Sequence, residues 1–202
     1  IFHYSWFFKK GKPCVYSSLA ISHPDPPYDF NLESEWISTC AGFFKKSIFD
    51  RYEFCREFIT FSNNEYIYLS NSLYKAGEGK LIYTSSAKYK GIVTNKGRLA
   101  NKDLQYMIES YDLFIFMRLF KANFGNIFLF AWSRIGRTII FYLRILLNFK
   151  YYFLKKNKKN NFLYQPNRDF LLPFKALLYA LINFKKIKKG DLSFYKRDFG
   201  EK

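Results

Sequence analysis

Charged side chains interrupt the long apolar stretches of this sequence. Residues 126–149 are rich in Ile, Leu and Phe but carry Arg134, Arg137 and Arg144, and residues 104–120 carry two carboxylates and an arginine. An arginine at the centre of a bilayer costs roughly 2.5–3.5 kcal/mol, whereas a Leu or Phe there gains only a few tenths. The sequence therefore predicts no membrane span, and a chain that is soluble or built into a larger assembly.

The composition combines positive charge with aromatic side chains. The 202 residues include 33 Lys and Arg against 16 Asp and Glu, a net charge of +17, yet 49% are hydrophobic and 22% aromatic. Disordered basic tails are poor in aromatics, so this composition predicts a folded body with a packed core. The charge predicts a polyanionic partner, either nucleic acid or an anionic membrane surface, and both fit the composition.

The charge is unevenly distributed along the chain and divides it into three segments. Residues 1–57 hold seven basic and seven acidic side chains, residues 58–149 hold twelve and five, and residues 150–202 hold fourteen and four. We expect the neutral, proline-punctuated first segment to be an extension that wraps over a neighbour, the second to be the folded core, and the third to be a basic extension.

The core segment shows patterns of both strands and helices. Aromatic and β-branched residues at 58–61 and 66–69 predict one strand, and residues 80–85 predict a second that pairs with it as a β-hairpin with a long loop. Apolar residues recur every three or four positions after Asn101, which is a good N-cap, and this spacing predicts a helix ended by Gly125 and Asn126.

A short apolar run at residues 127–132 predicts a buried strand, and residues 133–137 predict a turn into a second helix. The order of elements is then β-β-α-β-α. The expected fold class is α/β, a mixed β-sheet flanked by helices, with N- and C-terminal extensions.

Several short matches within residues 58–148 resemble one family, the universal small-subunit ribosomal protein eleven. Residues 61–64 read F-S-N-N, where the family has a strand opening with F-N-N. Residues 79–87 read G-K-L-I-Y-T-S-S-A, close to the family's G-x-x-I-x-W-S-S-A-G, and Lys90 and Gly91 close the loop that follows. Gly136 and Arg137 resemble the end of its G-S-G-R turn, and residues 143–146, L-R-I-L, resemble the helix ending I-R-A-L.

The sequence also departs from the family. Lys88 stands where the family has a glycine, the glycine-rich turn keeps only Gly136, and the family's C-terminal motif D-x-T-P-x-P-H-N-G-C-R-P-P is not found. The basic runs at residues 155–161 and 185–189 offer charge in the region where that motif is missing.

The resemblance implies a structural constituent of the small ribosomal subunit that binds ribosomal RNA on the platform, beside neighbouring ribosomal proteins and the messenger RNA exit. Loop hydroxyls and ammonium groups suit phosphates and 2′-hydroxyls, a tyrosine suits base stacking, and arginines at a helix start suit phosphate clamping. Asparagines that only shape a bulge, an ordinary exit loop and a solvated arginine face are the structural alternatives. The candidate RNA-binding residues are Asn63, Asn64, Ser85, Ser86, Lys88, Tyr89, Lys90, Arg134, Arg137, Arg144, Lys155, Lys156, Lys158 and Lys159.

The sequence does not favour an enzyme or a cofactor. Residues 58–149 contain no P-loop, no dinucleotide fingerprint and no histidine, and we identified no paired spacing among their five carboxylates. Cys14, Cys40 and Cys55 make an odd number of cysteines without a close pair. A metal site shared with His3 and His23 is one interpretation, but small buried thiols in a reducing compartment are the expectation.

The residue usage also bears on the compartment. Abundant Phe, Tyr, Lys, Asn and Ile are the residues that A+T-rich codons supply, which indicates an organelle genome. We expect a mitochondrial ribosome, with a relic plastid as second choice. The alternative function, from another class, is an accessory subunit of an organellar membrane-bound respiratory complex whose basic surface lies on anionic lipid.

Overall fold

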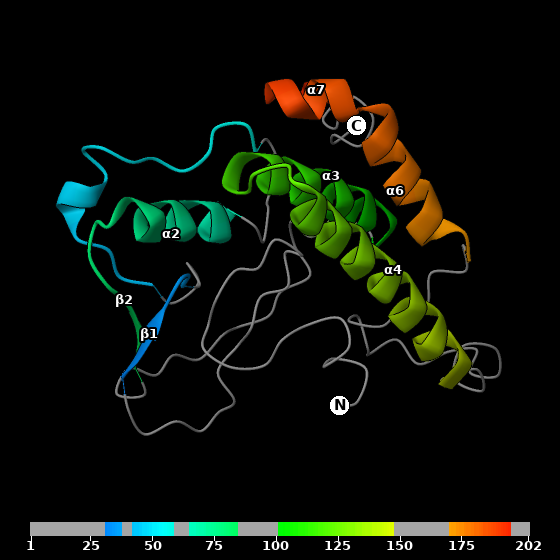
Figure 1. The fold of residues 1–202 in the computed structure, drawn as a ribbon, viewed down its shortest axis with the longest axis horizontal. Coiled ribbons are helices and arrows are strands. Elements are labelled where there is room, and N and C mark those ends of the chain that lie inside the picture. Colours follow the sequence, from blue (N-terminus) through cyan, green and yellow to red (C-terminus); the bar gives the residue numbers. More distant parts are fainter. Residues whose placement is uncertain (1–30, 38–41, 59–64, 85–100, 148–169, 195–202) are drawn as a thin grey trace.

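The computed structural model describes residues 31–37, 42–58, 65–84, 101–147 and 170–194 (Figure 1). Within these residues the fold is mixed α/β and mostly helical, with one small two-stranded antiparallel sheet. The elements, in chain order, are β1 (Leu32–Ser34), the 3-10 helix η2 (Lys46–Ile48), α2 (Glu65–Ala76), β2 (Leu81–Tyr83), α3 (Asn101–Leu119), α4 (Phe124–Leu147), α6 (Leu172–Ile182) and α7 (Phe184–Lys189).

Helix α3 forms the centre of the core. Its first residue is Asn101, the predicted N-cap. It ends at Leu119, so the predicted end at Gly125 and Asn126 is wrong, because both residues lie in α4. The α3 side chains Met107, Tyr111, Phe114 and Ile115 are all buried. Helices α2, α6 and α7 all contact it. A helix that is apolar on most of its circumference is stable only when neighbours cover it, and each fully buried side chain of this size contributes roughly 1.5–3 kcal/mol.

Helix α6 lies against α3 through small side chains. Ala176 and Ala180 are fully buried and one turn apart, so the two backbones can approach closely. Pro173 lies in the first turn of α6, where its missing N–H removes no helical hydrogen bond. Tyr106 of α3 and Tyr179 of α6 meet edge to face, with ring centroids 5.3 Å apart. The basic C-terminal segment thus contributes a helix to the core.

The strand expected at residues 66–69 is wrong, because these residues lie in helix α2. The buried positions Ile67, Ser70 and Leu73 recur every three residues, which is a helical spacing that the β-forming types of residues 66–69 obscured. After α2, Gly77 and Gly79 adopt positive φ angles of 70° and 121°, and the chain turns sharply toward β2.

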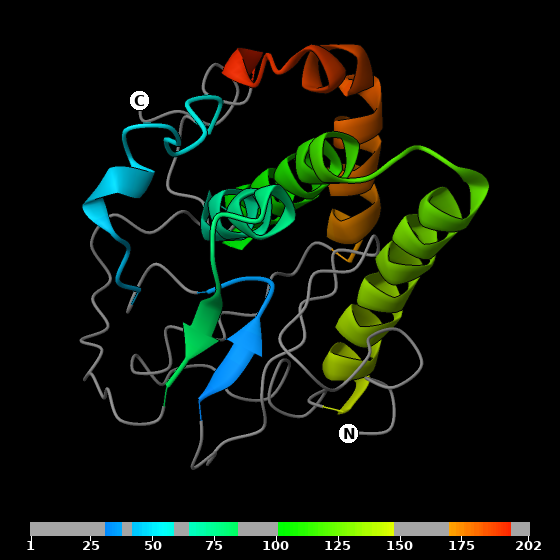
Figure 2. The same cartoon turned by 60° about the vertical axis from the view of Figure 1, so that its left-hand side comes forward.

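The predicted strand at residues 80–85 is present as β2, but its partner is not the one expected. β2 pairs antiparallel with β1, with Leu32 opposite Tyr83 and Ser34 opposite Leu81 (Figure 2). The predicted pairing of β2 with residues 66–69 is therefore wrong, and residues 59–64 of the predicted strand lie outside the described residues. Trp36, which follows β1, is buried and stacks on Tyr66 of α2 at 5.5 Å between ring centroids. Part of the first segment thus packs against the middle one.

The strand expected at residues 127–132 and the turn at residues 133–137 are also wrong, because both lie inside the single helix α4. A short apolar run has no period of its own that separates a buried strand from a helix. The side-chain oxygen of Asn123 accepts a hydrogen bond from the backbone N–H of Asn126 at 2.9 Å and thereby caps the start of α4. The helix expected after residue 137 is present as the second half of α4.

Helix α7 ends at Lys189, and Gly190 is its C-cap residue in the left-handed conformation. Its φ is 85°, and an added Cβ would lie 2.8 Å from Nη2 of Arg118. We expect Gly190→Ala to lower the free energy of unfolding by about 1–2 kcal/mol, because an L-residue resists this left-handed conformation. Urea denaturation would measure the change.

Gly125→Ala is the matched control for that substitution. Gly125 lies in the first turn of α4, and an added Cβ would have ordinary contact, 3.7 Å from the side chain of Asn123. Ala favours the helix, so stability should stay the same or rise by up to about 1 kcal/mol. Equal losses in the two variants would contradict the conformation of Gly190.

Candidate nucleic-acid interface

Most of the predicted RNA-binding residues lie outside the described residues. These are Asn63, Asn64, Ser85, Ser86, Lys88, Tyr89, Lys90, Lys155, Lys156, Lys158 and Lys159. The backbone of Arg144 lies in α4, and the described side chains among the candidates are those of Arg134 and Arg137. Their role as predicted RNA contacts can therefore be compared with their surroundings.

The sequence suggested that Arg134 lies at the start of a helix. In the structure it lies in the middle of α4 and is 4% exposed. Its Nη1 lies 2.5 Å from Oδ2 of Asp112 and 3.4 Å from Oε2 of Glu109, both on α3. Free backbone N–H groups and the positive end of the helix dipole are absent from a mid-helix position. Arg134 is thus engaged in a buried ion pair with α3.

Arg137 takes part in the same charge cluster. Its Nη1 lies 2.7 Å from Oδ2 of Asp112, and its side chain is 31% exposed. Residues three apart on a helix share a face, so Glu109 and Asp112 on α3 point together, as do Arg134 and Arg137 on α4. Two arginines oppose two carboxylates, so the cluster has no net charge. A phosphate would compete with these carboxylates for the guanidinium groups.

The ionisation of Asp112 follows from its neighbours. Burial by itself raises the pKa of a carboxyl group, but the guanidinium groups of Arg137 and Arg134 outweigh burial and hold the pKa of Asp112 below its usual value. Burial would likewise lower the pKa of Arg134, and the carboxylates of Glu109 and Asp112 raise it instead. Asp112 and Arg134 therefore both stay ionised, and their ion pair joins α3 to α4.

A sequence signal for this cluster was present. Glu109 and Asp112 lie one turn apart, so the interpretation that the carboxylates of the middle segment lack paired spacing is wrong. The two arginines have the same spacing. Opposite charges at matching helical spacing predict facing helices, but this signal became usable only if residues 127–137 were recognised as helix.

Within the described part of the chain, helix α7 carries a dense run of exposed lysines, at the upper edge of the molecule in Figure 1. The six-residue helix reads F-K-K-I-K-K, and all four lysines are exposed. Ile187 is fully buried and anchors the helix to the core that contains Leu192 and Phe194. Lysines in the last turn also favour the negative end of the helix dipole. The arrangement holds four ammonium groups in water on a fixed support, where phosphates can reach them.

The cysteine that the structure describes is a half-buried thiol. Cys55 donates a hydrogen bond from Sγ to Oε2 of Glu57 at 3.0 Å, and burial together with this carboxylate raises the pKa of the thiol to about 12. A nucleophilic or metal-binding cysteine needs a thiolate. The described residues hold no group of three or more His, Cys, Asp and Glu side chains that could bind a metal ion. The other cysteines and both histidines lie outside them.

A helix that crosses a bilayer needs about 20 consecutive, predominantly apolar residues. None of them, in the ranges that the structure covers, is both long and apolar enough to cross a membrane.

The charge cluster predicts a marked effect of Asp112→Asn on stability. The substitution leaves Arg134 buried with only Glu109, and we expect a loss of about 3 kcal/mol in the free energy of unfolding, the lower end of the range for a broken buried pair. Because the folded pKa of Asp112 is lowered, its contribution is present above the usual carboxyl pKa of about 4 and is lost as the pH falls through the folded value. Urea denaturation at pH 7 and at pH 3 measures both effects.

Glu33→Gln is the matched control for the charge cluster. Glu33 pairs with Lys80 at 3.3 Å, but both side chains are more than half exposed. Such a surface pair contributes little, and its loss should change stability by less than about 1 kcal/mol. If Asp112→Asn cost no more than Glu33→Gln, the cluster would not hold α4 on α3.

The environment of Cys55 predicts slow alkylation. With a pKa of about 12, the thiolate at pH 8 is on the order of a thousandfold scarcer than for a free cysteine. Mass spectrometry of the peptide that contains Cys55 should show much slower reaction with iodoacetamide in the folded chain than in urea. Equal rates in the two conditions would argue against a protonated, half-buried thiol.

No protein-family model, no curated protein and no solved structure matches this chain.

Proposed function

We propose that this chain is a structural constituent of the small subunit of a mitochondrial ribosome, where it binds ribosomal RNA on the platform near the messenger RNA exit. A relic plastid is the second compartment considered. The observation that carries the proposal is the one-sided charge of the C-terminal half: between Asp112 and Asp191 the sequence contains a single acidic residue, Asp169. The exposed lysines of α7 belong to this half.

The family resemblance supports the proposal mainly through residues 79–91. β2 lies within this match, and the predicted loop with Ser85, Ser86, Lys88, Tyr89 and Lys90 follows it. Helix α3 comes next, in the order that the family has. The β-β-α-β-α order itself is not part of the proposal, because α2 and α4 occupy two of the expected strands and Gly136 and Arg137 lie within α4.

The physics of RNA binding suits a chain of this kind. Ammonium groups that replace counterions around phosphates supply affinity without sequence specificity and make binding depend on salt. Lysine acts as a point charge on a flexible stem and needs no fixed geometry to contact a phosphate. The anchored helix α7 contributes four such groups, and residues 155–159 contribute four more in the sequence. We infer a scaffold role with no enzymatic step and no cofactor.

Membership of the ribosome can be tested by sedimentation. In a mitochondrial lysate of the source organism, the chain should co-sediment with the small subunit and leave it after ribonuclease treatment or at high salt. Ultraviolet crosslinking should join residues 88–90 to RNA. Recovery in detergent-extracted respiratory complexes, without RNA crosslinks, would overturn the proposal.

The contribution of α7 can be tested with the purified full chain and transcribed small-subunit ribosomal RNA. Replacing Lys185, Lys186, Lys188 and Lys189 by Gln should weaken binding and reduce the slope of log affinity against log salt by about 2–4, since each lost phosphate contact removes about one unit. Filter binding between 50 and 300 mM salt measures the slope.

A control with the same loss of charge separates contact from general attraction. Lys45, Lys46, Arg56 and Lys80 are exposed and lie outside α7. Replacing all four by Gln should leave the slope nearly unchanged. If both sets of substitutions reduced it equally, α7 would contribute only net charge and would not be an RNA contact.

A further inference from the structure

Helix α4 turns Arg134 and Arg137 toward the carboxylates of α3 and exposes many of its apolar side chains. Ser133 and Arg134 are buried against α3, whereas Ile135, Ile139 and Leu143 are each more than 40% exposed. A helix on the surface of a protein in water normally shows the opposite arrangement. The inverted polarity indicates that the outer face of α4 meets something apolar.

Seven of the exposed apolar residues of α4 form one continuous stripe. They are separated by three or four positions, so they share one face along a helix about 36 Å long. Leu146, near the end of the helix, is 68% exposed. The stripe consists of Phe124, Phe128, Trp132, Ile135, Ile139, Leu143 and Leu146.

Helix α6 exposes a second stripe with the same character. Its inner face, with Ala176 and Ala180, is buried on α3, while Phe174, Leu178 and Ile182 on the outer face are 54%, 57% and 73% exposed. A helix that is hydrophobic all round is normally buried on all sides. The outer face of α6 therefore also lacks the apolar cover that its composition requires.

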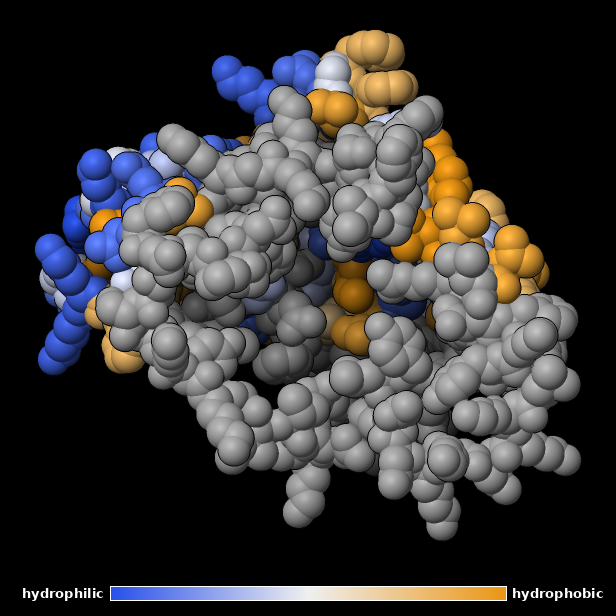
Figure 3. Space-filling model, turned by 90° about the horizontal axis from the view of Figure 1, so that it is seen from below, coloured by the Kyte–Doolittle hydropathy of each residue, from blue (hydrophilic) through white to orange (hydrophobic). Residues whose placement is uncertain are grey.

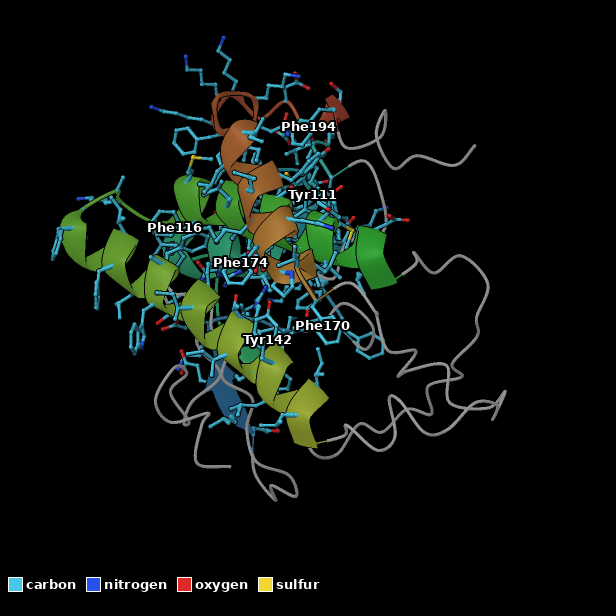
Figure 4. The ribbon with its side chains drawn as sticks, turned by 90° about the vertical axis from the view of Figure 1, so that its right-hand side faces the viewer. Tyr111, Phe116, Tyr142, Phe170, Phe174 and Phe194 are labelled. Carbon is cyan, nitrogen blue, oxygen red and sulfur yellow. The ribbon has the colours of Figure 1, made fainter. Side chains whose placement is uncertain are left out.

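The two helices that carry the stripes contact each other at the start of the α6 stripe. The ring of Tyr142 on α4 lies beside that of Phe174 on α6, 6.3 Å between centroids, and the Tyr142 hydroxyl donates a hydrogen bond to the backbone carbonyl of Phe170 (Figure 4). Figure 3 shows hydrophobic side chains gathered on the right-hand side of the molecule, where α4 and α6 lie in Figure 1. We call the two stripes together the apolar face.

The charged residues of α4, α6 and α7, which carry and flank the apolar face, are all basic. The described residues from 119 to 147 and from 170 to 190 include no Asp or Glu, and the lysines of α7 follow directly after the stripe of α6. A second copy of the chain, with its own +17 charge, would be repelled. RNA offers phosphates but little apolar surface. An anionic lipid bilayer offers both acyl chains and phosphates.

We propose that the apolar face docks on the surface of an anionic lipid bilayer, with α4 and α6 lying in the interfacial plane and the lysines of α7 contacting the headgroups. The apolar side chains enter the boundary between headgroups and acyl chains, and the buried Arg134 remains paired with Asp112. This attachment goes beyond RNA binding and uses side chains that RNA does not need.

Vesicle co-sedimentation of the full chain tests this proposal. The chain should bind vesicles of phosphatidylcholine that contain about 30% phosphatidylglycerol at least tenfold more tightly than vesicles of phosphatidylcholine alone. Leu178→Glu with Ile182→Glu on α6, or Ile139→Glu on α4, should weaken binding to the anionic vesicles by about tenfold or more, because a carboxylate then faces acyl chains and anionic headgroups. Equal binding to neutral and anionic vesicles, or no binding to either, would overturn the proposal.

Matched controls keep the result specific to this face. Phe43 and Ile82 are exposed apolar residues outside α4 and α6, so Phe43→Glu with Ile82→Glu should leave vesicle binding unchanged. Equal losses in the control and the α6 variant would overturn the proposal. So would a concentration-dependent dimer that the α6 substitutions abolish without affecting vesicle binding, because the face would then join two copies.

RNA binding of the same variants separates the two proposals. Each Glu variant should keep its helical circular dichroism. The α6 variant should bind ribosomal RNA as tightly as the Phe43→Glu with Ile82→Glu control, which has the same net charge. Loss of vesicle binding with retained RNA binding supports the lipid surface, whatever the outcome of the ribosome test. Retained vesicle binding in the α4 and α6 variants would overturn it even if RNA binding were confirmed.

Discussion

The buried ion pairs between α3 and α4 determine how the rest of the molecule is presented. Arg134 is almost wholly enclosed, and a buried guanidinium without a carboxylate is far less stable than in water. Its pairing with Asp112 therefore fixes which side of α4 faces α3. Because that side carries the charges, the other side must carry Ile135, Ile139 and Leu143. This polar interaction thus places the apolar stripe of α4 on the outside.

The core around α3 also supports the basic helix α7, which follows the C-terminal end of α6. Buried Ile187 fixes α7, so its lysines project from a rigid base although the helix is too short to be stable alone. Positive charge on a fixed support attracts polyanions of several kinds. RNA binding and lipid attachment differ in what else they use, since lipid alone rewards burial of apolar side chains.

Together the two surfaces describe a protein suited to a crowded assembly. Its apolar face, with Leu146 and Ile182 among the most exposed residues, is large for a chain that works alone in water. Between Asp112 and Asp191 its basic side chains are opposed by a single acidic residue, Asp169. We propose that partners outside the chain account for both features.

The sequence by itself determined the helix that begins at Asn101, the strand at residues 81–83 and the uneven distribution of charge, because strong periodicity, turn glycines and residue counts are local properties. Only the tertiary structure decided that residues 66–69 and 127–132 are helical, since short apolar runs fit either period until neighbours cover one side. The partner of β2 and the burial of Arg134 were decided in the same way. Leu32 pairs with Tyr83, 51 positions further along the chain, and Ser34 pairs with Leu81, 47 positions further along. Such a distant pairing, and the choice of Arg134 between a phosphate and a carboxylate, depend on which elements meet in space, and no local pattern encodes that.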